Sequence, residues 1–115
     1  MPSSNDFLAQ ALLSDDLHAA AARHLEVTDH ELRLTLEDGR TLGVPLHWFP
    51  RLAEGTPDER ARWELVAQGQ AIHWPDLDED IHLTSLLAGR RSQESAASLA
   101  RWRTALAHAR AARAG

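Results

Sequence analysis

The feature that most constrains this sequence is a pair of alternating apolar runs on either side of Asp38-Gly39. The apolar positions are Leu32, Leu34 and Leu36 before the turn and Leu42, Val44 and Leu46 after it. Strict alternation of apolar and polar residues is typical of strands that bury one face. An Asp-Gly pair between two such runs predicts a β-hairpin.

The length of the hairpin loop decides which side chains share a face. A two-residue loop would pair Leu34 with Gly43 and put the two apolar sets on opposite faces. A three-residue loop, 37–39, pairs Leu34 with Leu42 instead. It also places Gly39 where a type I turn followed by a G1 bulge needs a positive φ. Because one shared apolar face can be buried in one core, we expect the bulged hairpin.

Periodicity in the rest of the chain predicts an α+β fold, with a small antiparallel sheet packed by helices. Short strands are expected near 24–28, 70–74 and 80–83, and helices at about 5–22, 57–67 and 93–112. The clearest helix start is Thr56-Pro57-Asp58-Glu59, which has the order of a capping box with proline at the first helical position. That helix is expected to bury Trp63 and Val66 and to stop at Gly69. The last helix, capped by Ser92, has an apolar stripe of Leu99, Trp102, Leu106 and Ala109.

These elements suggest three parts within the 115 residues: an N-terminal helical extension (1–23), an α+β core domain (24–91) and a C-terminal basic helix (92–115). The chain has no cysteine, which excludes disulfides, thiolate metal sites and thiol nucleophiles. The first residues have neither the basic start of a signal peptide nor the length of a membrane span. We therefore expect a cytoplasmic protein with no membrane partner.

Charge is distributed unevenly along the chain. The net charge is −5, but residues 1–89 hold 6 Arg against 16 acidic residues, whereas residues 90–115 hold 6 Arg against Glu94 alone. A basic tail attracts a phosphate backbone or an acidic protein surface. The same arginines could equally be solvated or pair with the acidic body. Both interpretations remain open at the level of sequence.

Motifs for catalysis and for cofactor binding are missing. The chain has no Gly-x-Ser-x-Gly elbow and no glycine-rich phosphate loop, and its serines cluster at expected helix caps. Residues 76–80 place carboxylates as a calcium loop does at its first positions, but Ile81 and Leu87 stand where that loop needs Gly and Glu. His73 and His82 flank this acidic segment without the spacing of a zinc motif. We expect no enzyme activity, no cofactor and no metal, with a metal site at these two histidines as a weak alternative.

Partner binding is the remaining class of function, and two sets of residues are candidates for it. Tryptophan is favoured at interface hot spots, although Trp48 and Trp74 could instead be core residues, as Trp63 and Trp102 are expected to be. The candidate protein-binding residues are Asp76, Asp78, Glu79, Asp80, Trp48 and Trp74. The candidate contacts for nucleic acid or for an acidic partner are Arg90, Arg91, Arg101 and Arg103, which do not line up on one helix face.

Several separate motifs resemble the bacterial domain-of-unknown-function family 2442 over about residues 24–102. They are Asp38-Gly39-Arg40, Val44-Pro45-Leu46, Trp48-Phe49-Pro50-Arg51-Leu52, the Thr56-to-Trp63 helix start, Ile72-His73-Trp74-Pro75 and Leu77-Asp78-Glu79-Asp80-Ile81. The resemblance implies a compact α+β domain with a small antiparallel sheet. It also implies a partner component of small toxin–antitoxin-like gene pairs, some relatives of which carry a helix-turn-helix domain. The resemblance supplies no catalytic residues, and it does not explain residues 1–23.

Three hypotheses follow. The first is a non-catalytic interaction module of the antitoxin or regulatory type, whose acidic body suits a basic partner. The second is a nucleic-acid-associated transcriptional regulator that uses the tail arginines. The third and weakest is a metal-binding protein using His73, His82 and the 76–80 acids. A homodimer is also expected, because a small sheet leaves open edges and amphipathic helices need a surface on which to bury their stripes.

Overall fold

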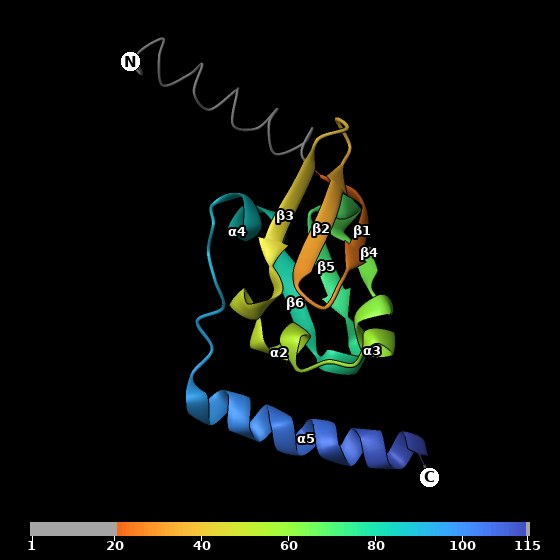
Figure 1. The fold of residues 1–115 in the computed structure, drawn as a ribbon, viewed down its shortest axis with the longest axis vertical. Coiled ribbons are helices and arrows are strands. Elements are labelled where there is room, and N and C mark those ends of the chain that lie inside the picture. The colour runs from red at the N-terminus through yellow and green to blue at the C-terminus, as the bar shows by residue number, and fades with distance from the viewer. Residues whose placement is uncertain (1–20, 115) are drawn as a thin grey trace.

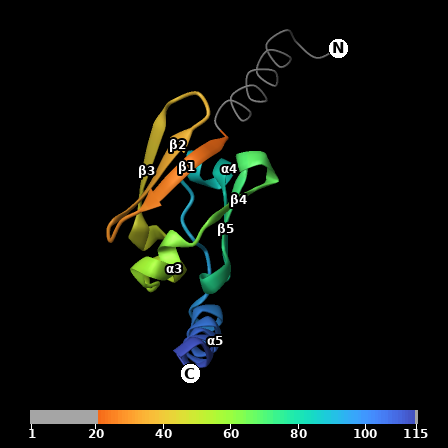
Figure 2. The ribbon, with the colours of Figure 1, turned by 90° about the vertical axis from the view of Figure 1, so that its right-hand side faces the viewer.

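Two three-stranded antiparallel sheets frame the part of the chain that the computed structural model describes, residues 21–114. The first sheet has the order β1 (Ala22–Val27), β2 (Glu31–Leu36) and β3 (Thr41–Pro45). The second has the order β4 (Glu64–Val66), β5 (Ala71–Trp74) and β6 (Glu79–His82). Figure 2 shows the two sheets facing each other. The fold is therefore α+β, as the periodicity predicted.

Short helices fill the turns between the strands, and one long helix ends the described part of the chain. In chain order they are η1 (Leu46–Trp48), α2 (Pro50–Ala53), α3 (Pro57–Ala61), η2 (Ala67–Gly69), η3 (Pro75–Leu77), α4 (Leu83–Leu87) and α5 (Ala96–Ala114). Residues 88–95, here called the connector, join α4 to α5, and α5 lies across the base of the molecule beneath α2 and α3 (Figure 1). None of the helices within 21–114 is both long and apolar enough to cross a membrane. The helix expected over 5–22 falls outside the described residues, except that Ala22 begins β1.

The hairpin register is the one that the apolar pattern predicted. Leu34 lies opposite Leu42, and Leu32 lies opposite Val44. Gly39 has a φ of +91°, and no atom lies within 4 Å of the Cβ it lacks, so its conformation rather than crowding requires glycine. The inner face of the hairpin is buried in the core, with Leu32 fully inaccessible to solvent.

The helix predicted over 57–67 is too long. The capping box forms as predicted, but α3 ends at Ala61, and β4 begins at Glu64 and pairs with β5. Leu65 lies opposite Ile72, so pairing within a sheet outweighs the local helical pattern. Val66, expected to be buried, is 37% exposed. Trp63, expected to be buried by the helix, lies after the end of α3 and is half-buried, packed against the core.

The expected antiparallel strands form two sheets rather than one, because β5 and β6 pair with β4 and not with the first hairpin. The β4–β5 hairpin is one that the sequence did not reveal. Its turn is η2, in which Ala67 and Gln68 have positive φ values of 51° and 58°. These residue types rarely adopt that conformation and give no turn signal. Gly69, predicted to end a helix, closes this turn instead.

Helix α5 begins three residues later than predicted. The Ser95 hydroxyl accepts a hydrogen bond from the Ser98 amide at 3.1 Å, as an N-cap does, whereas the Ser92 amide donates to Trp48 O at 3.0 Å. Trp102 and Leu106 are buried, Leu99 is half-buried, and Ala109 is exposed. The apolar stripe is therefore shorter than the sequence suggested.

Candidate functional site

The acidic segment 76–80 does not form one continuous exposed patch. Asp76 forms ion pairs with Arg62 and, at 3.3 Å, with Arg113 of α5. Asp78 forms a longer ion pair with Arg51, at 3.6 Å, but it is in the left-handed conformation and its side chain is 87% exposed. Asp76 therefore fastens parts of the chain together, and Asp78 is the residue of this segment most available to a partner.

The outer face of the second sheet brings three further polar side chains into one row. Glu64 lies opposite His73, and His73 lies opposite Asp80. His73 Nδ1 is 2.7 Å from Asp80 Oδ1. Val66 and His82 occupy the next row, on either side of β5. This face thus combines acids, imidazoles and an exposed apolar side chain.

Glu79 is the acid that the sequence could not place. It pairs with Trp74 and lies on the same face of the second sheet as the buried residues, so its side chain is half-buried. Burial raises the pKa of its carboxyl to about 7, although nearby Arg51 lowers it in part. Its Oε1 accepts a hydrogen bond from the Asp80 amide at 3.1 Å. Glu79 also lines a cavity of about 330 Å³ between β6 and the connector.

Arg51 of α2 joins the connector to the body. Its Nε donates to Glu94 Oε1 at 2.8 Å, and its Nη1 donates to Asp78 O at 2.6 Å. The guanidinium lies 5.4 Å from the ring centroid of Trp102. Hydrogen bonding to Arg51, helped by Ser98, lowers the pKa of Glu94 to about 2. Paired carboxylate and guanidinium groups with little exposure are typical of a structural contact.

Glu59 anchors α5 from the other end. Its side chain is 3% exposed, and its Oε1 accepts hydrogen bonds from the Thr56 amide at 2.9 Å and from Arg110 Nη2 at 2.7 Å. Arg113 Nη2 donates to Glu59 Oε2 at 2.8 Å. Hydrogen bonds from Arg110 and Thr56 lower the pKa of this carboxyl to about 2 despite its burial. One capping glutamate therefore also holds two of the tail arginines.

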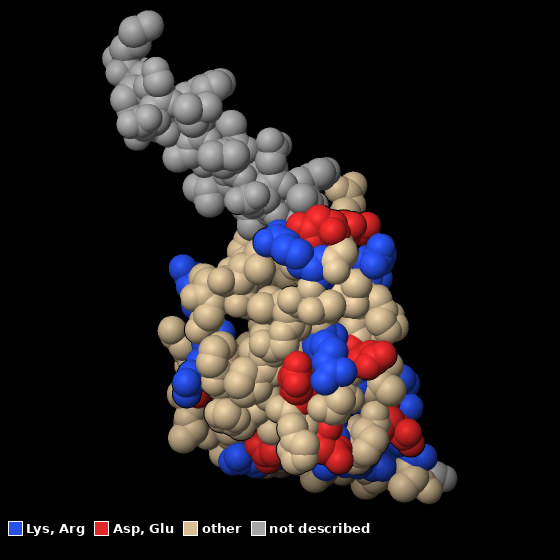
Figure 3. Space-filling model, turned by 45° about the horizontal axis from the view of Figure 1, so that its top comes forward, with Lys and Arg blue, Asp and Glu red and all other residues tan. Residues whose placement is uncertain are grey.

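The candidate arginines divide into paired and unpaired groups. Arg103 Nε donates to Glu54 Oε1 at 2.6 Å. Acidic and basic side chains lie next to one another rather than in separate patches on the face shown in Figure 3. Arg91 stacks on the half-buried Trp48, with its guanidinium 4.7 Å from the ring centroid. Within residues 21–114, three of the tail arginines form no ion pair: Arg90, Arg91 and Arg101.

The tryptophans are mostly structural. Trp74 is fully buried and its indole N–H donates to Arg60 O at 3.1 Å, so it is a core residue and offers no surface to a partner. Trp102 is 6% exposed and donates to Leu77 O at 2.7 Å. Of the two tryptophans proposed for partner binding, Trp48 is the one that remains partly accessible.

The histidine pair does not gather metal ligands. His73 lies opposite Asp80, and His82 lies opposite Ala71, so the two rings are diagonal neighbours rather than partners. No group of three or more His, Asp or Glu side chains within the described residues is arranged to hold a metal ion.

Comparison with known proteins places these features in a family context. The model of the family described as "Protein of unknown function (DUF2442)" matches residues 22–92. No curated protein matches the chain. The match ends inside the connector, so α5 lies beyond it.

Two solved structures are similar in fold. A protein of unknown function from Rhodospirillum rubrum is 26% identical, with a TM-score of 0.57, and the alignment covers 64% of this chain and 92% of that one. An uncharacterized protein from Chromobacterium violaceum is 19% identical, with a TM-score of 0.59, covering 88% of this chain and 93% of the other. The second likeness concerns the fold alone.

Proposed function

The chain belongs to the DUF2442 family, whose function is unknown, and on that premise we propose that it is a non-catalytic protein-interaction module. The supporting observation is the outer face of the second sheet, where the row Glu64, His73 and Asp80 lies beside the exposed Val66. A sheet face that combines a large apolar side chain with charges of one sign suits a specific protein partner.

The partner that fits this face is basic. Glu64, Asp78 and Asp80 are exposed. Of the nearby arginines, Arg62 pairs with Asp76, and Arg51 pairs more closely with Glu94 than with Asp78. Complementary charge accelerates association and disfavours wrong partners. We therefore propose the antitoxin-type or regulatory role, in which the module binds a small basic toxin-like protein.

The test is capture of a partner from the host that encodes the chain, followed by reconstitution with the purified partner. The wild type and the control Glu26→Arg/Glu37→Arg, altered on the first sheet and its hairpin, are expected to recover the same protein in a 1:1 complex. The variant Glu64→Arg/Asp80→Arg is expected to bind it at least tenfold more weakly. Equal binding by both variants, or a wild-type chain that forms no stoichiometric complex, would contradict the proposal.

A second candidate is a nucleic-acid-associated regulator, which the unpaired Arg90, Arg91 and Arg101 favour. Three phosphate contacts would give a measurable but shallow salt dependence. The pairing of Arg103, Arg110 and Arg113 with carboxylates removes half of the tail charge from this role. Binding of random-sequence DNA and RNA at low salt, compared with the variant Arg90→Ala/Arg91→Ala/Arg101→Ala, separates the two candidates.

A further inference from the structure

The cavity beside Glu79 is bounded by a free sheet edge on one side and by extended chain on the other. Its lining comes from β6, from Ser85 of α4 and from residues 90–93 of the connector, with Phe49 beneath. Figure 1 shows the connector running down the outer edge of the molecule from α4 to α5. No strand pairing joins the connector to β6. The cavity is therefore a slot between two stretches of backbone.

The outer edge of β6 presents unpaired backbone groups to this slot. The Leu83 amide donates to Gln70 O at 2.9 Å, which continues the β5–β6 register by one pair. Hydrogen-bonded and non-hydrogen-bonded pairs alternate in an antiparallel ladder. The N–H groups of Asp80 and His82 therefore point away from β5 and toward the slot, as does the Asp80 carbonyl.

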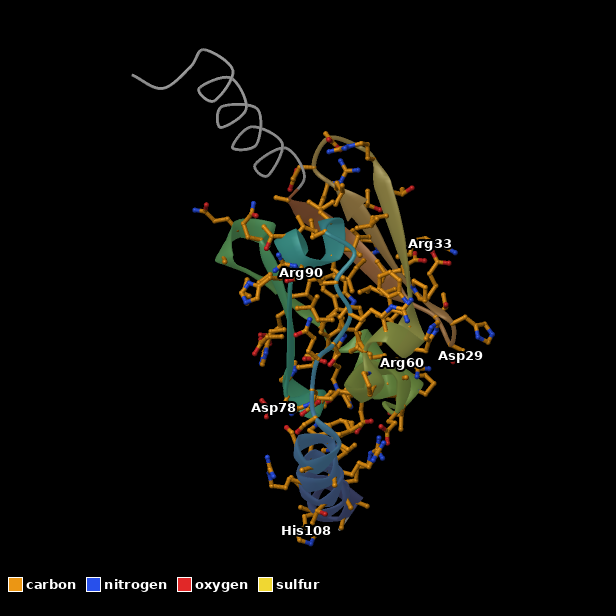
Figure 4. The ribbon with its side chains drawn as sticks, turned by 90° about the vertical axis from the view of Figure 1, so that its left-hand side faces the viewer. Asp29, Arg33, Arg60, Asp78, Arg90 and His108 are labelled. Carbon is orange, nitrogen blue, oxygen red and sulfur yellow. The ribbon has the colours of Figure 1, made fainter. Side chains whose placement is uncertain are left out.

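Side chains around the slot occupy hydrogen-bonding positions that a bound peptide could take. The Glu79 carboxylate accepts from the outward Asp80 amide at 3.1 Å, in the position that a peptide carbonyl would take. Arg90 and Arg91 form the opposite wall; Arg90 has no ion pair within the described residues, and Arg91 is held on the Trp48 ring. Figure 4 shows Arg90 beside α4, where the connector begins. A guanidinium group is a favourable partner for a carboxylate, and both residues line this slot.

We propose that this slot binds the last residues of a partner's polypeptide, adding them as an extended strand to the edge of β6 with the C-terminal carboxylate against Arg90 and Arg91. The inference rests on the proposed role as an interaction module and names a second contact for it, distinct from the outer face. The slot has a volume of about 330 Å³. Its three outward backbone groups lie within residues 80–82, which matches an added strand of about three residues. On binding, a peptide carbonyl replaces Glu79 as the acceptor for the Asp80 amide. Because the pKa of Glu79 is raised to about 7, this carboxyl is partly protonated at neutral pH and repels the peptide carboxylate less.

The test uses the full chain labelled with ¹⁵N and a pool of N-acetylated tetrapeptides with free C-termini. Amide resonances of Asp80, His82 and 90–93 are expected to shift with the free-acid pool and to shift at least tenfold less with the same pool amidated. His82→Pro removes the outward N–H without breaking a β5–β6 hydrogen bond, because His82 has a φ of −88° and its amide does not face β5. It is expected to abolish the shifts, whereas His82→Ala, which keeps the N–H, is expected to preserve them.

A second variant keeps the test decisive if His82→Pro does not fold. Arg90→Ala/Arg91→Ala changes exposed connector side chains and is expected to weaken binding of the free-acid pool at least tenfold, with spectral changes confined to the connector and the surroundings of Trp48. The proposal is overturned if neither pool binds, if the amidated pool binds equally, or if His82→Pro binds like the wild type. Partner capture by His82→Pro through the outer face would then show that the module role survives without the slot.

Discussion

At the scale of single residues, Glu59 is the one buried carboxylate within residues 21–114, and two of its partners lie far away in sequence. Glu59 belongs to a capping box that the sequence predicted, yet it also binds Arg110 and Arg113, more than fifty residues later. Local spacing reveals the first role because its partners are three residues apart. It cannot reveal the second, since that depends on where α5 docks.

Glu59→Gln is expected to lower the free energy of unfolding by about 2–3 kcal/mol at pH 7, because two arginines lose a charged acceptor. The folded pKa of about 2 lies below the ordinary 4.5, so this stabilisation is present above pH 4.5 and is lost as the pH falls toward 2. Urea unfolding between pH 7 and pH 2.5 should show the two proteins converging. Glu37→Gln, at an exposed hairpin position, serves as the control, and a difference that does not depend on pH would contradict the assignment.

The charged form of Glu79 is expected to destabilise the fold, whereas the charged form of Glu59 stabilises it. The unfolded chain loses this proton near pH 4.5, whereas the folded chain holds it until about pH 7, so the free energy of unfolding falls as the pH rises through that interval. Glu79→Gln should therefore be more stable than the wild type by about 1–2 kcal/mol at pH 8 and nearly equal to it at pH 4. Thermal unfolding at both pH values tests this, with the exposed Glu64→Gln as the charge control. A variant that is less stable at pH 8 would show that Glu79 is needed in its charged form.

At the scale of elements, the sequence predicted those helices and strands whose form depends on the local residue pattern and on burial of one face. The β2–β3 register followed from the requirement that the leucines share one face, and the structure has that register. The predicted helix over 57–67 failed beyond Ala61 because β4 is held by β5, a partner that periodicity within the segment cannot reveal. Trp74 was ambiguous for a similar reason, since the carbonyl that accepts its indole N–H belongs to Arg60.

The contact between the β4–β5 turn and β1 can be tested by substituting Gly69. Gly69 has a φ of +83°, and a Cβ there would lie 2.5 Å from the Ala22 carbonyl oxygen of β1. Gly39 has a similar φ of +91° but open space around it. Gly69→Ala should therefore lose roughly 3 kcal/mol of stability, against about 1 kcal/mol for Gly39→Ala, which adds conformational strain without a clash. Urea unfolding of both variants measures the difference, and equal losses would mean that the turn moves away from β1 freely.

At the scale of the whole molecule, the charge asymmetry is largely resolved within the chain. The basic tail folds back on the acidic body through Arg103 with Glu54 and through Arg110 and Arg113 with Glu59. Counting charges along the sequence left pairing and external binding equally open, because both predict the same composition. The family match stops before α5, yet Trp102 and Leu106 of this helix are buried in the core. Helix α5 is thus an integral part of this chain's fold.

Reversing the two anchoring charges should release that helix. In Arg110→Glu/Arg113→Glu, two new carboxylates face Glu59, whose side chain is only 3% exposed and therefore weakly screened. We expect a loss of about 2–3 kcal/mol of stability and at least tenfold faster amide hydrogen exchange along 96–114, with exchange in β2 and β3 changing less. Arg23→Glu/Arg90→Glu makes the same change in net charge at exposed arginines outside α5 that form no ion pair within residues 21–114, and it should leave exchange in α5 unaltered. If both double variants loosened α5 equally, net charge rather than the contacts with Glu59 would be what holds the helix in place.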